Sequence, residues 1–191
     1  MVKKSRTKIY QIGIMGSESD EVNQELKTRA AELGKEIAKR GHVLLTGGGV
    51  KGVPFYAAEA AKSVGGTVVA IIPGFSPASF RRAKVRNAKV FDVIIQTGLS
   101  SSLLEKNSIG LDYLNINSCD AVIFVSGRLG TFAEFLIALK ANKVIGVLDK
   151  SGGMNSYFAD FAHKAGKKII TTTEPRKLIR QILKNIPSST V

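Results

Sequence analysis

The sequence AVIFVSGRLGTFAE, residues 121–134, decides the fold of this chain. Its first five residues, Ala121 to Val125, are apolar without alternation, which is typical of a strand buried on both faces of a parallel sheet. A turn of small residues follows, and an apolar helical pattern then begins at residue 131. A strand, a glycine-containing turn and a helix in this order aim backbone N–H groups at an anion. Glu134 lies one turn into the helix, where it serves either the helix dipole or the chemistry of the site.

Apolar runs of strand length alternate with helical patterns along the rest of the chain. The predicted strands are residues 8–15, 43–46, 67–72, 90–96, 121–125, 144–148 and 168–171. The predicted helices are residues 21–40, 54–64, 100–118, 131–141, 156–165 and 173–186, and residues 75–89 are predicted as a long, partly helical loop. Ser19 or Asp20 is the expected N-cap of the first helix. Such alternation predicts a parallel sheet with helices on both faces.

The fold class that follows is α/β, a single-domain Rossmann-like three-layer sandwich with a mostly parallel sheet. The chain has 191 residues, which is enough for one well-buried core. We expect one domain over residues 1–191, with flexible tails at 1–7 and 187–191.

The composition excludes several classes of protein. No apolar run reaches the ~18 to 20 residues that a membrane span needs. Cys119 is the single cysteine, which excludes an internal disulfide framework and suits the cytosol. His42 and His163 lie far apart and give no metal-ligand spacing. We therefore expect a cytoplasmic protein with no membrane contact, no bound metal and no cofactor.

The formal net charge of +13 favours anionic partners. Basic residues cluster at 3–8 and at 81–89. These clusters either bind polyanions, from nucleotides to nucleic acid, or form a solvated basic face. Only Phe75 and Phe80 lie near the second cluster as stacking platforms, so we expect nucleic-acid binding to be weak and non-specific at most.

Three glycine-containing turns follow the first, second and fifth predicted strands. In a parallel sheet these turns open at the same edge, and ligands bind there near the topological switch. The turn over residues 47–52 lacks the Gly-Lys-Ser/Thr ending of a P-loop. The predicted ligand-binding residues of the three turns are Gly16, Ser17, Gly47, Gly48, Gly49, Gly52, Gly127, Arg128, Gly130 and Thr131.

Several motifs together resemble the LOG ("lonely guy", or lysine-decarboxylase-like) family of Rossmann-type proteins. They are TGGGVKG at residues 46–52, IPG at 72–74, DAVI at 120–123, and Gly127-x-x-Gly130-Thr131-x-x-Glu134. The resemblance covers roughly residues 8–150 and is strongest to the short prokaryotic branch, which is similar to molybdenum-cofactor carrier proteins. It implies phosphate binding by the glycines and Thr131, and a phosphoribohydrolase in which Glu134 works at the ribose with an upstream arginine. It also implies a homodimer.

This chain departs from the family pattern at three places. Ser126 stands where the family has proline, and Arg128 where it has a second glycine. Leu111-Asp112 occupies the place of an arginine-containing pair, which removes a cation from the reacting sugar and leaves ligand binding intact. Arg128 either donates to the phosphate or fills the pocket, and a positive φ there would cost about 1 kcal/mol or more.

The function predicted from these residues is binding of a nucleoside 5′-monophosphate or a similar phosphorylated ligand. One hypothesis adds hydrolysis of the N-glycosidic bond, with Glu134 as the catalytic residue that stabilises an oxocarbenium-like sugar and deprotonates water. The alternatives are a non-enzymatic carrier of a phosphorylated pterin-type cofactor, and single-stranded nucleic-acid binding. The helix at 131–141 is apolar on nearly all sides, which favours a homodimer or higher homo-oligomer.

Overall fold

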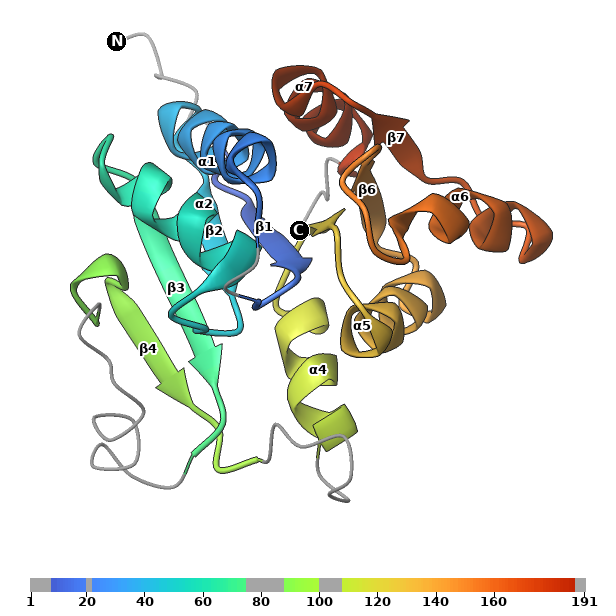
Figure 1. Cartoon of the computed structure of the whole chain (residues 1–191). Helices are drawn as coiled ribbons and strands as arrows, with labels where there is room; N and C mark the ends of the chain where they lie inside the picture. The colour runs from blue at the N-terminus through green and yellow to red at the C-terminus, as the bar shows by residue number, and fades with distance from the viewer. Residues whose placement is uncertain (1–7, 20–21, 75–87, 100–107, 188–191) are drawn as a thin grey trace, which may run out of the picture.

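Seven parallel strands form one sheet in the order β4-β3-β2-β1-β5-β6-β7 (Figure 1). The computed structural model describes residues 8–19, 22–74, 88–99 and 108–187. The strands are β1 (Gln11–Gly16), β2 (Val43–Thr46), β3 (Thr67–Ile72), β4 (Val93–Gln96), β5 (Ala121–Val125), β6 (Val144–Leu148) and β7 (Ile170–Thr172).

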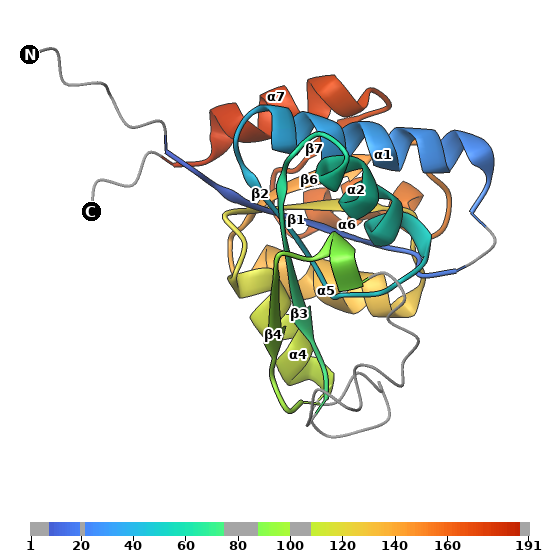
Figure 2. The ribbon, with the colours of Figure 1, turned by 90° about the vertical axis from the view of Figure 1, so that its left-hand side faces the viewer.

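Helices cover both faces of the sheet and give three layers (Figure 2). One face carries α1 (Gln24–Lys39), α2 (Gly52–Lys62) and α7 (Pro175–Asn185). The other carries α4 (Ser108–Asn117), α5 (Leu129–Lys140) and α6 (Asn155–Lys164). A short 3₁₀ helix, η1 (Ala88–Val90), precedes β4. The predicted Rossmann-like α/β class is confirmed, and no helix among the described residues is long and apolar enough to cross a membrane.

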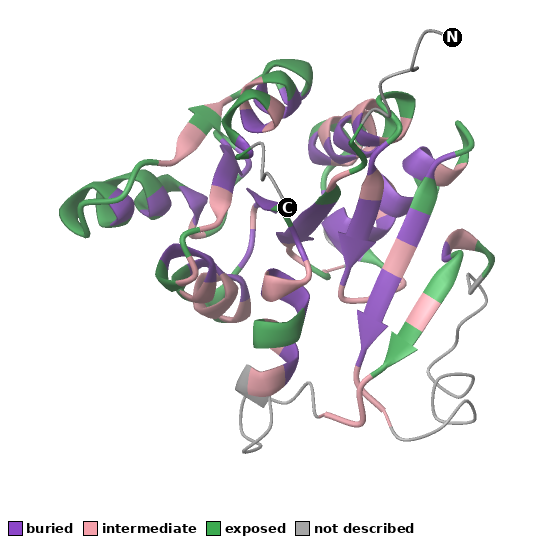
Figure 3. Cartoon of the chain, turned by 180° about the vertical axis from the view of Figure 1, so that it is seen from behind, coloured by how far each residue is buried: buried purple, intermediate pink, exposed green. Residues whose placement is uncertain are grey.

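The core lies on both sides of β5, as its unbroken apolar run predicts. All five residues of β5 are buried, with Ile123 facing the α1 layer and Phe124 facing the α5 layer. Phe124 packs edge-on against Phe135 and Phe158, at ring-centroid distances of 5.5 and 5.8 Å. The edge strand β4 is mostly exposed by contrast (Figure 3).

Several predicted boundaries are wrong by a few residues. α1 begins at Gln24, because Asn23 and neither Ser19 nor Asp20 is its N-cap: the Asn23 Oδ1 accepts a 2.8 Å hydrogen bond from the N–H of Leu26. β4 begins at Val93, because the Asp92 side chain is engaged by Lys62 and by the N–H of Val68.

Three other elements also begin at residues that differ from the prediction. β1 begins at residue 11 and β7 at residue 170, and α5 begins at residue 129, two residues earlier than predicted. This earlier start makes Arg128 the N-cap of α5. The described residues leave out the predicted tail at 1–7, residues 188–191 of the predicted tail at 187–191, most of the predicted loop at 75–89, and residues 100–107 of the predicted helix at 100–118.

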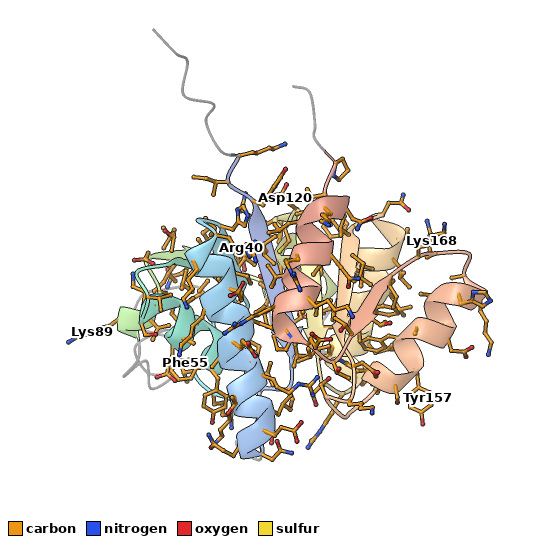
Figure 4. All side chains as sticks on the ribbon, turned by 90° about the horizontal axis from the view of Figure 1, so that it is seen from above. Arg40, Phe55, Lys89, Asp120, Tyr157 and Lys168 are labelled. Atoms are coloured by element: carbon orange, nitrogen blue, oxygen red, sulfur yellow. The ribbon has the colours of Figure 1, made fainter. Side chains whose placement is uncertain are left out.

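The strand order places the topological switch in the middle of the sheet. From β1 the chain adds β2, β3 and β4 on one side, and then returns to add β5, β6 and β7 on the other. β1 pairs with β2 through Gly13↔Leu45 and with β5 through Gly16↔Val125. The turns after β1, β2 and β5 therefore leave three adjacent strands at one edge. Figure 4 shows Asp120 at the opposite edge, with Phe55 and Tyr157 towards the turn edge.

Candidate functional site

The turn after β1 is held between the turn after β2 and the end of β5. The carbonyl of Ser17 accepts a 2.8 Å hydrogen bond from the N–H of Val53 in the first turn of α2. A Cβ on Gly52 would lie 2.2 Å from that carbonyl oxygen, and a Cβ on Gly16 would lie 2.1 Å from the carbonyl oxygen of Val125. The predicted residues of the three turns therefore lie together at one edge, and glycine is what permits the close packing.

The turn after β2 is shaped by its threonine and its glycines. The buried Thr46 accepts a 3.1 Å hydrogen bond at Oγ1 from the N–H of Gly48. Gly48 has a φ of 77°, and a Cβ there would lie 2.1 Å from the Cγ2 of Ile72. A Cβ on Gly49 would lie 2.5 Å from the Oε1 of Glu18, so the carboxylate of Glu18 packs against this turn.

The turn after β5 is supported from behind by the segment between β6 and α6. The N–H of Ser126 donates a 2.8 Å hydrogen bond to the Oγ of Ser151. The amide nitrogen of Asn155 donates to the same Oγ and to the carbonyl of Phe124, each at 3.0 Å. The carbonyl of Gly127 accepts a 3.0 Å bond from the N–H of Met154. Sequence reasoning missed Ser151 and Asn155, because nothing in their loop sequence signals that they hold a distant turn.

The backbone of this turn differs at two of the positions that depart from the family pattern. Arg128 is extended, with a φ of −119°, so the cost of a positive φ does not arise at this position. Ser126 instead carries the positive φ, at 56°. Gly127 has a φ of 126°, and a Cβ there would lie 2.4 Å from the Oγ1 of Thr131. A Cβ on Gly130 would meet no atom of the described residues within 4 Å outside its own helix turn, so no described segment covers the start of α5 at this residue.

The start of α5 is suited to an anion. No side chain caps the helix at Arg128, and the first N–H groups of a helix have no partner within it. The helix dipole adds a partial positive charge at this end. The side chain of Arg128 is exposed and has no hydrogen bond or ion pair with any described residue, so its guanidinium does not fill the turn.

Three carboxylates gather beside this turn. Glu134 lies on α5, Asp112 on α4, and Glu18 follows β1. Burial raises the pKa of Glu134 to about 8, and the negative charges of Asp112 and Glu18 add to the effect. Burial also raises the pKa of Asp112 and the pKa of Glu18. For Glu18 alone, the positive charge of Lys51 partly offsets this rise. The site is therefore acidic where the family pattern places a cation.

Asn115 adds a buried amide to the same region. It is 3% exposed, and its Oδ1 has no hydrogen-bond partner among the described residues. Its Nδ2 lies 3.7 Å from the position of a Cβ on Gly47, and the Oε1 of Glu18 lies 3.9 Å from that position. The amide nitrogen is therefore the atom of Asn115 that faces the glycine turn, and the Oδ1 is an exception to the rule that buried polar atoms are paired.

The described residues offer little support for a catalytic thiol, a metal site or a second ligand pocket. Burial raises the pKa of the Cys119 thiol to about 12, so it is a core residue, as predicted, and a poor nucleophile. The described residues contain no group of three His, Cys, Asp or Glu placed to hold a metal ion. A groove of about 780 Å³ lies elsewhere, between α1, α2 and Arg176 of α7. Arg176 pairs there with Glu32 at 2.8 Å, so we interpret the groove as a solvated charged surface.

Fold and site together define a Rossmann-like α/β protein with glycine turns and an uncapped helix start at its switch point. The chain belongs to the SLOG cluster4 family, whose model matches residues 9–179. The LOG-like resemblance drawn from the motifs is thereby confirmed. An uncharacterized protein of Archaeoglobus fulgidus is 37% identical over 142 residues, which are 74% of this chain and 81% of that protein.

Solved structures share the fold across nearly the whole chain. The molybdenum cofactor carrier protein of Chlamydomonas reinhardtii is 28% identical with a TM-score of 0.73, over 93% of this chain and 100% of that one. The molybdenum cofactor binding protein of Rippkaea orientalis is 27% identical with a TM-score of 0.73, over 94% and 99%. DNA processing protein A of Helicobacter pylori, a single-stranded DNA binder, shares the fold at 22% identity and a TM-score of 0.66, over 93% and 82%.

Proposed function

We propose that this protein binds a nucleoside 5′-monophosphate or a similarly phosphorylated small ligand at the switch point. The phosphate lies on residues 127–131 at the start of α5, and the turn at residues 47–52 borders the nucleoside. The observation that carries the proposal is the open space above Gly130 at an uncapped helix start. Structural neighbours named as molybdenum cofactor carrier or binding proteins support a small-molecule ligand.

The geometry favours binding over rapid hydrolysis. Glu134 is the carboxylate best placed for N-glycosidic chemistry, but its pKa of about 8 keeps it largely protonated at neutral pH. A protonated carboxyl neither stabilises an oxocarbenium ion nor removes a proton from water. Leu111 is buried and supplies no cation. Hydrolysis of a nucleoside 5′-monophosphate is therefore weak and rises with pH, which leaves the carrier role as the second candidate.

A single added methyl group tests the phosphate site. Gly130→Ala introduces a Cβ that meets no described residue within 4 Å outside its own helix turn, so we expect the fold to be kept and the approach of a phosphate to the helix start to be hindered. Binding of AMP, CMP and GMP is measured by thermal shift, because a ligand at 100 times its Kd stabilises by about 2.7 kcal/mol. We expect the shift to be lost in Gly130→Ala and kept in Lys140→Ala, an exposed position at the other end of α5. An equal shift in Gly130→Ala and wild type contradicts the phosphate site.

Hydrolysis is tested separately from binding. Release of free base from the same monophosphates is followed by chromatography at pH 7 and pH 9, for wild type and Glu134→Gln. Activity that rises with pH and is lost in Glu134→Gln supports weak hydrolysis. Binding without release of base at either pH supports the carrier role. Brisk release by Glu134→Gln contradicts any catalytic assignment to Glu134.

We also infer that the chain forms a homodimer through the face made by α4, α5 and α6. This face exposes large apolar side chains that the core does not use: Tyr113, Leu114, Leu129, Leu136, Tyr157 and Phe161. Such patches on soluble proteins usually mark an interface. Light scattering should give a dimer for wild type and a monomer for Leu136→Asp. Val64→Asp, on the opposite face, is the control, and a monomeric wild type contradicts the inference.

Nucleic acid is the weaker candidate partner. The basic cluster at 81–89 that motivated it falls almost entirely outside the described residues, so its position relative to the site carries no argument. Retention of single-stranded DNA in a filter assay should be slight at low salt and absent at physiological salt.

A further inference from the structure

Two polar groups from distant parts of the chain meet on one side of Gly47. The Nδ2 of Asn115, on α4, lies 3.7 Å from the position of a Cβ on Gly47. The Oε1 of Glu18, which follows β1, lies 3.9 Å from the same position. A hydrogen-bond donor and a hydrogen-bond acceptor therefore flank one point of the turn that borders the nucleoside in the proposed function.

Stability does not account for an amide at residue 115. Asn115 is 3% exposed, and its Oδ1 has no hydrogen-bond partner among the described residues. An unpaired buried acceptor destabilises a folded protein, and a leucine of similar shape would fill this place on α4 without that cost. The Nδ2 gives the amide a role, because it faces the glycine turn, where a ligand can accept its hydrogen bond.

The carboxylate of Glu18 brings two oxygen atoms to the same turn. A Cβ on Gly49 would lie 2.5 Å from its Oε1 and 3.1 Å from its Oε2, so glycine at residue 49 leaves room for both. An ionised carboxylate only accepts hydrogen bonds, and its two oxygens can take two parallel N–H groups. The turn is thus bordered by one donor and a pair of acceptors.

We propose that Asn115 and Glu18 recognise the ring of the ligand, and that this ring carries an oxo group, an N–H and an amino group along one edge, as guanine does. The Nδ2 of Asn115 donates to the ring oxygen, and the two oxygens of Glu18 accept from the ring N–H and the amino group. This inference rests on the proposed function and specifies the base of its ligand.

The other common bases match this pair of side chains less well. Guanine presents one acceptor followed by two donors along the edge of its six-membered ring, and hypoxanthine lacks the second donor. Adenine and cytosine offer a single amino group beside a ring nitrogen that only accepts, and uracil places a second oxygen against the carboxylate. A site built for hydrogen bonds discriminates strongly against a ligand that leaves its polar groups unpaired.

Nucleotides that differ only along this edge test the proposal. GMP, IMP and AMP share the ribose and the phosphate, and IMP lacks only the amino group of GMP. Calorimetry at pH 8, which favours the ionised form of Glu18, should show GMP bound roughly fivefold more tightly than IMP and at least roughly tenfold more tightly than AMP. Equal affinity for GMP and IMP, or for GMP and AMP, overturns the inference and leaves the phosphate site intact. No binding of GMP, IMP, AMP or CMP overturns the proposed function as well.

Asn115→Leu separates recognition of the ring from stability. The substitution removes the donor together with the unpaired Oδ1, so the Tm of the ligand-free protein should stay the same or rise, while the preference for GMP over AMP falls several-fold. Asn117→Leu, on the same helix, is the control, because its Nδ2 donates a 2.9 Å hydrogen bond to the carbonyl of Tyr113. An unchanged preference in Asn115→Leu overturns the inference.

Glu18→Gln tests the carboxylate independently of residue 115. Glutamine keeps the size of the side chain but replaces one acceptor oxygen with an NH₂ donor, so the preference for GMP over IMP should be lost. Glu25→Gln, at an exposed position on α1, is the matched control and should keep the wild-type ratio. A GMP-to-IMP ratio in Glu18→Gln that equals that of wild type shows that Glu18 does not read the ring and overturns the inference.

Discussion

The backbone N–H of Ser126 donates a 2.8 Å hydrogen bond to the hydroxyl of Ser151, which lies 25 residues further along the chain. Ser126 is the residue of the turn after β5 that holds a positive φ, at 56°. A non-glycine residue in this conformation is strained by about 1 to 2 kcal/mol and persists only where its surroundings impose it. The loop before α6 thus fixes the geometry of the proposed phosphate turn.

Ser151→Ala should destabilise the protein and loosen this turn. The substitution leaves the N–H of Ser126 without its partner and removes one acceptor of Asn155. The cost of an unpaired buried donor is about 1 to 3 kcal/mol. Urea unfolding measures this loss, and Ser156→Ala, on the exposed side of α6, should show none. Equal stability of Ser151→Ala and wild type contradicts the supporting role.

Gly34→Ala should destabilise the protein although alanine is the better helix former. A Cβ at this position would lie 1.9 Å from the carbonyl oxygen of Ala57, where α1 and α2 pack most closely. Alanine in place of glycine normally stabilises a helix by about 1 kcal/mol, whereas overpacking costs about 1 to 3 kcal/mol. Thermal melting should show a lower Tm for Gly34→Ala and no loss for Gly130→Ala, whose added Cβ meets open space.

Glu134→Gln should stabilise the ligand-free protein at alkaline pH. Folding raises the pKa of Glu134 from its usual 4.5 to about 8, so the folded state keeps a proton that the unfolded chain releases. The free energy of unfolding therefore falls as pH rises from about 4.5 to about 8, and is flat above that range. The variant lacks this penalty and should be about 1 to 3 kcal/mol more stable than wild type at pH 9, and equal to it at pH 4.

Urea unfolding across this pH range provides the measurement for Glu134→Gln. Glu25→Gln, at an exposed position on α1, should follow the wild-type profile. Parallel pH profiles for Glu134→Gln and wild type indicate that Glu134 ionises normally in the folded state, and that the acidic cluster is not desolvated.

Arg29→Lys should weaken the attachment of α1 to the ends of β6 and β7. The guanidinium of Arg29 donates to the carbonyls of Asp149 at 2.5 Å, Lys150 at 3.0 Å and Thr173 at 2.9 Å. A lysine ammonium lacks the planar fork that reaches all three oxygens, so we expect a loss of about 1 to 3 kcal/mol in urea unfolding. Arg40→Lys, which alters a surface pair with Glu36, should cost at most about 0.5 kcal/mol.

The buried strands of this fold follow closely from the sequence. The bounds of β2, β3, β5 and β6 agree with the predicted ranges, because each is an apolar run that glycine, proline or polar residues delimit. The starts of β1, β4 and β7 were predicted too early. Their positions depend on side chains that compete for the backbone, as Asp92 does when it binds the N–H of Val68.

The candidate site was predictable in its glycine turns and not in its surroundings. Turns that follow neighbouring parallel strands meet at one edge, so the motifs alone place them together. Glu18, Asn115 and Ser151 were not predicted, because each acts through a neighbour that is remote in sequence and no local pattern marks it. The sequence showed Asp112 only as a departure from the family pattern. In the structure, its negative charge contributes to the raised pKa of Glu134.

The central position of β1 has a consequence for the order in which the chain folds. β1 pairs with β2 across one short crossover, but its other neighbour is β5, and the N–H of Gln11 bonds to Asp120, 109 positions away. Contacts that close long loops form slowly, so the β1–β2–β3 half assembles before β5 docks beside it. The proposed anion-binding turn follows β5, and Glu18 follows β1. We therefore expect ligand binding during refolding to appear only when β5 pairs with β1. An intermediate that lacks this pairing should have secondary structure but should not bind the ligand.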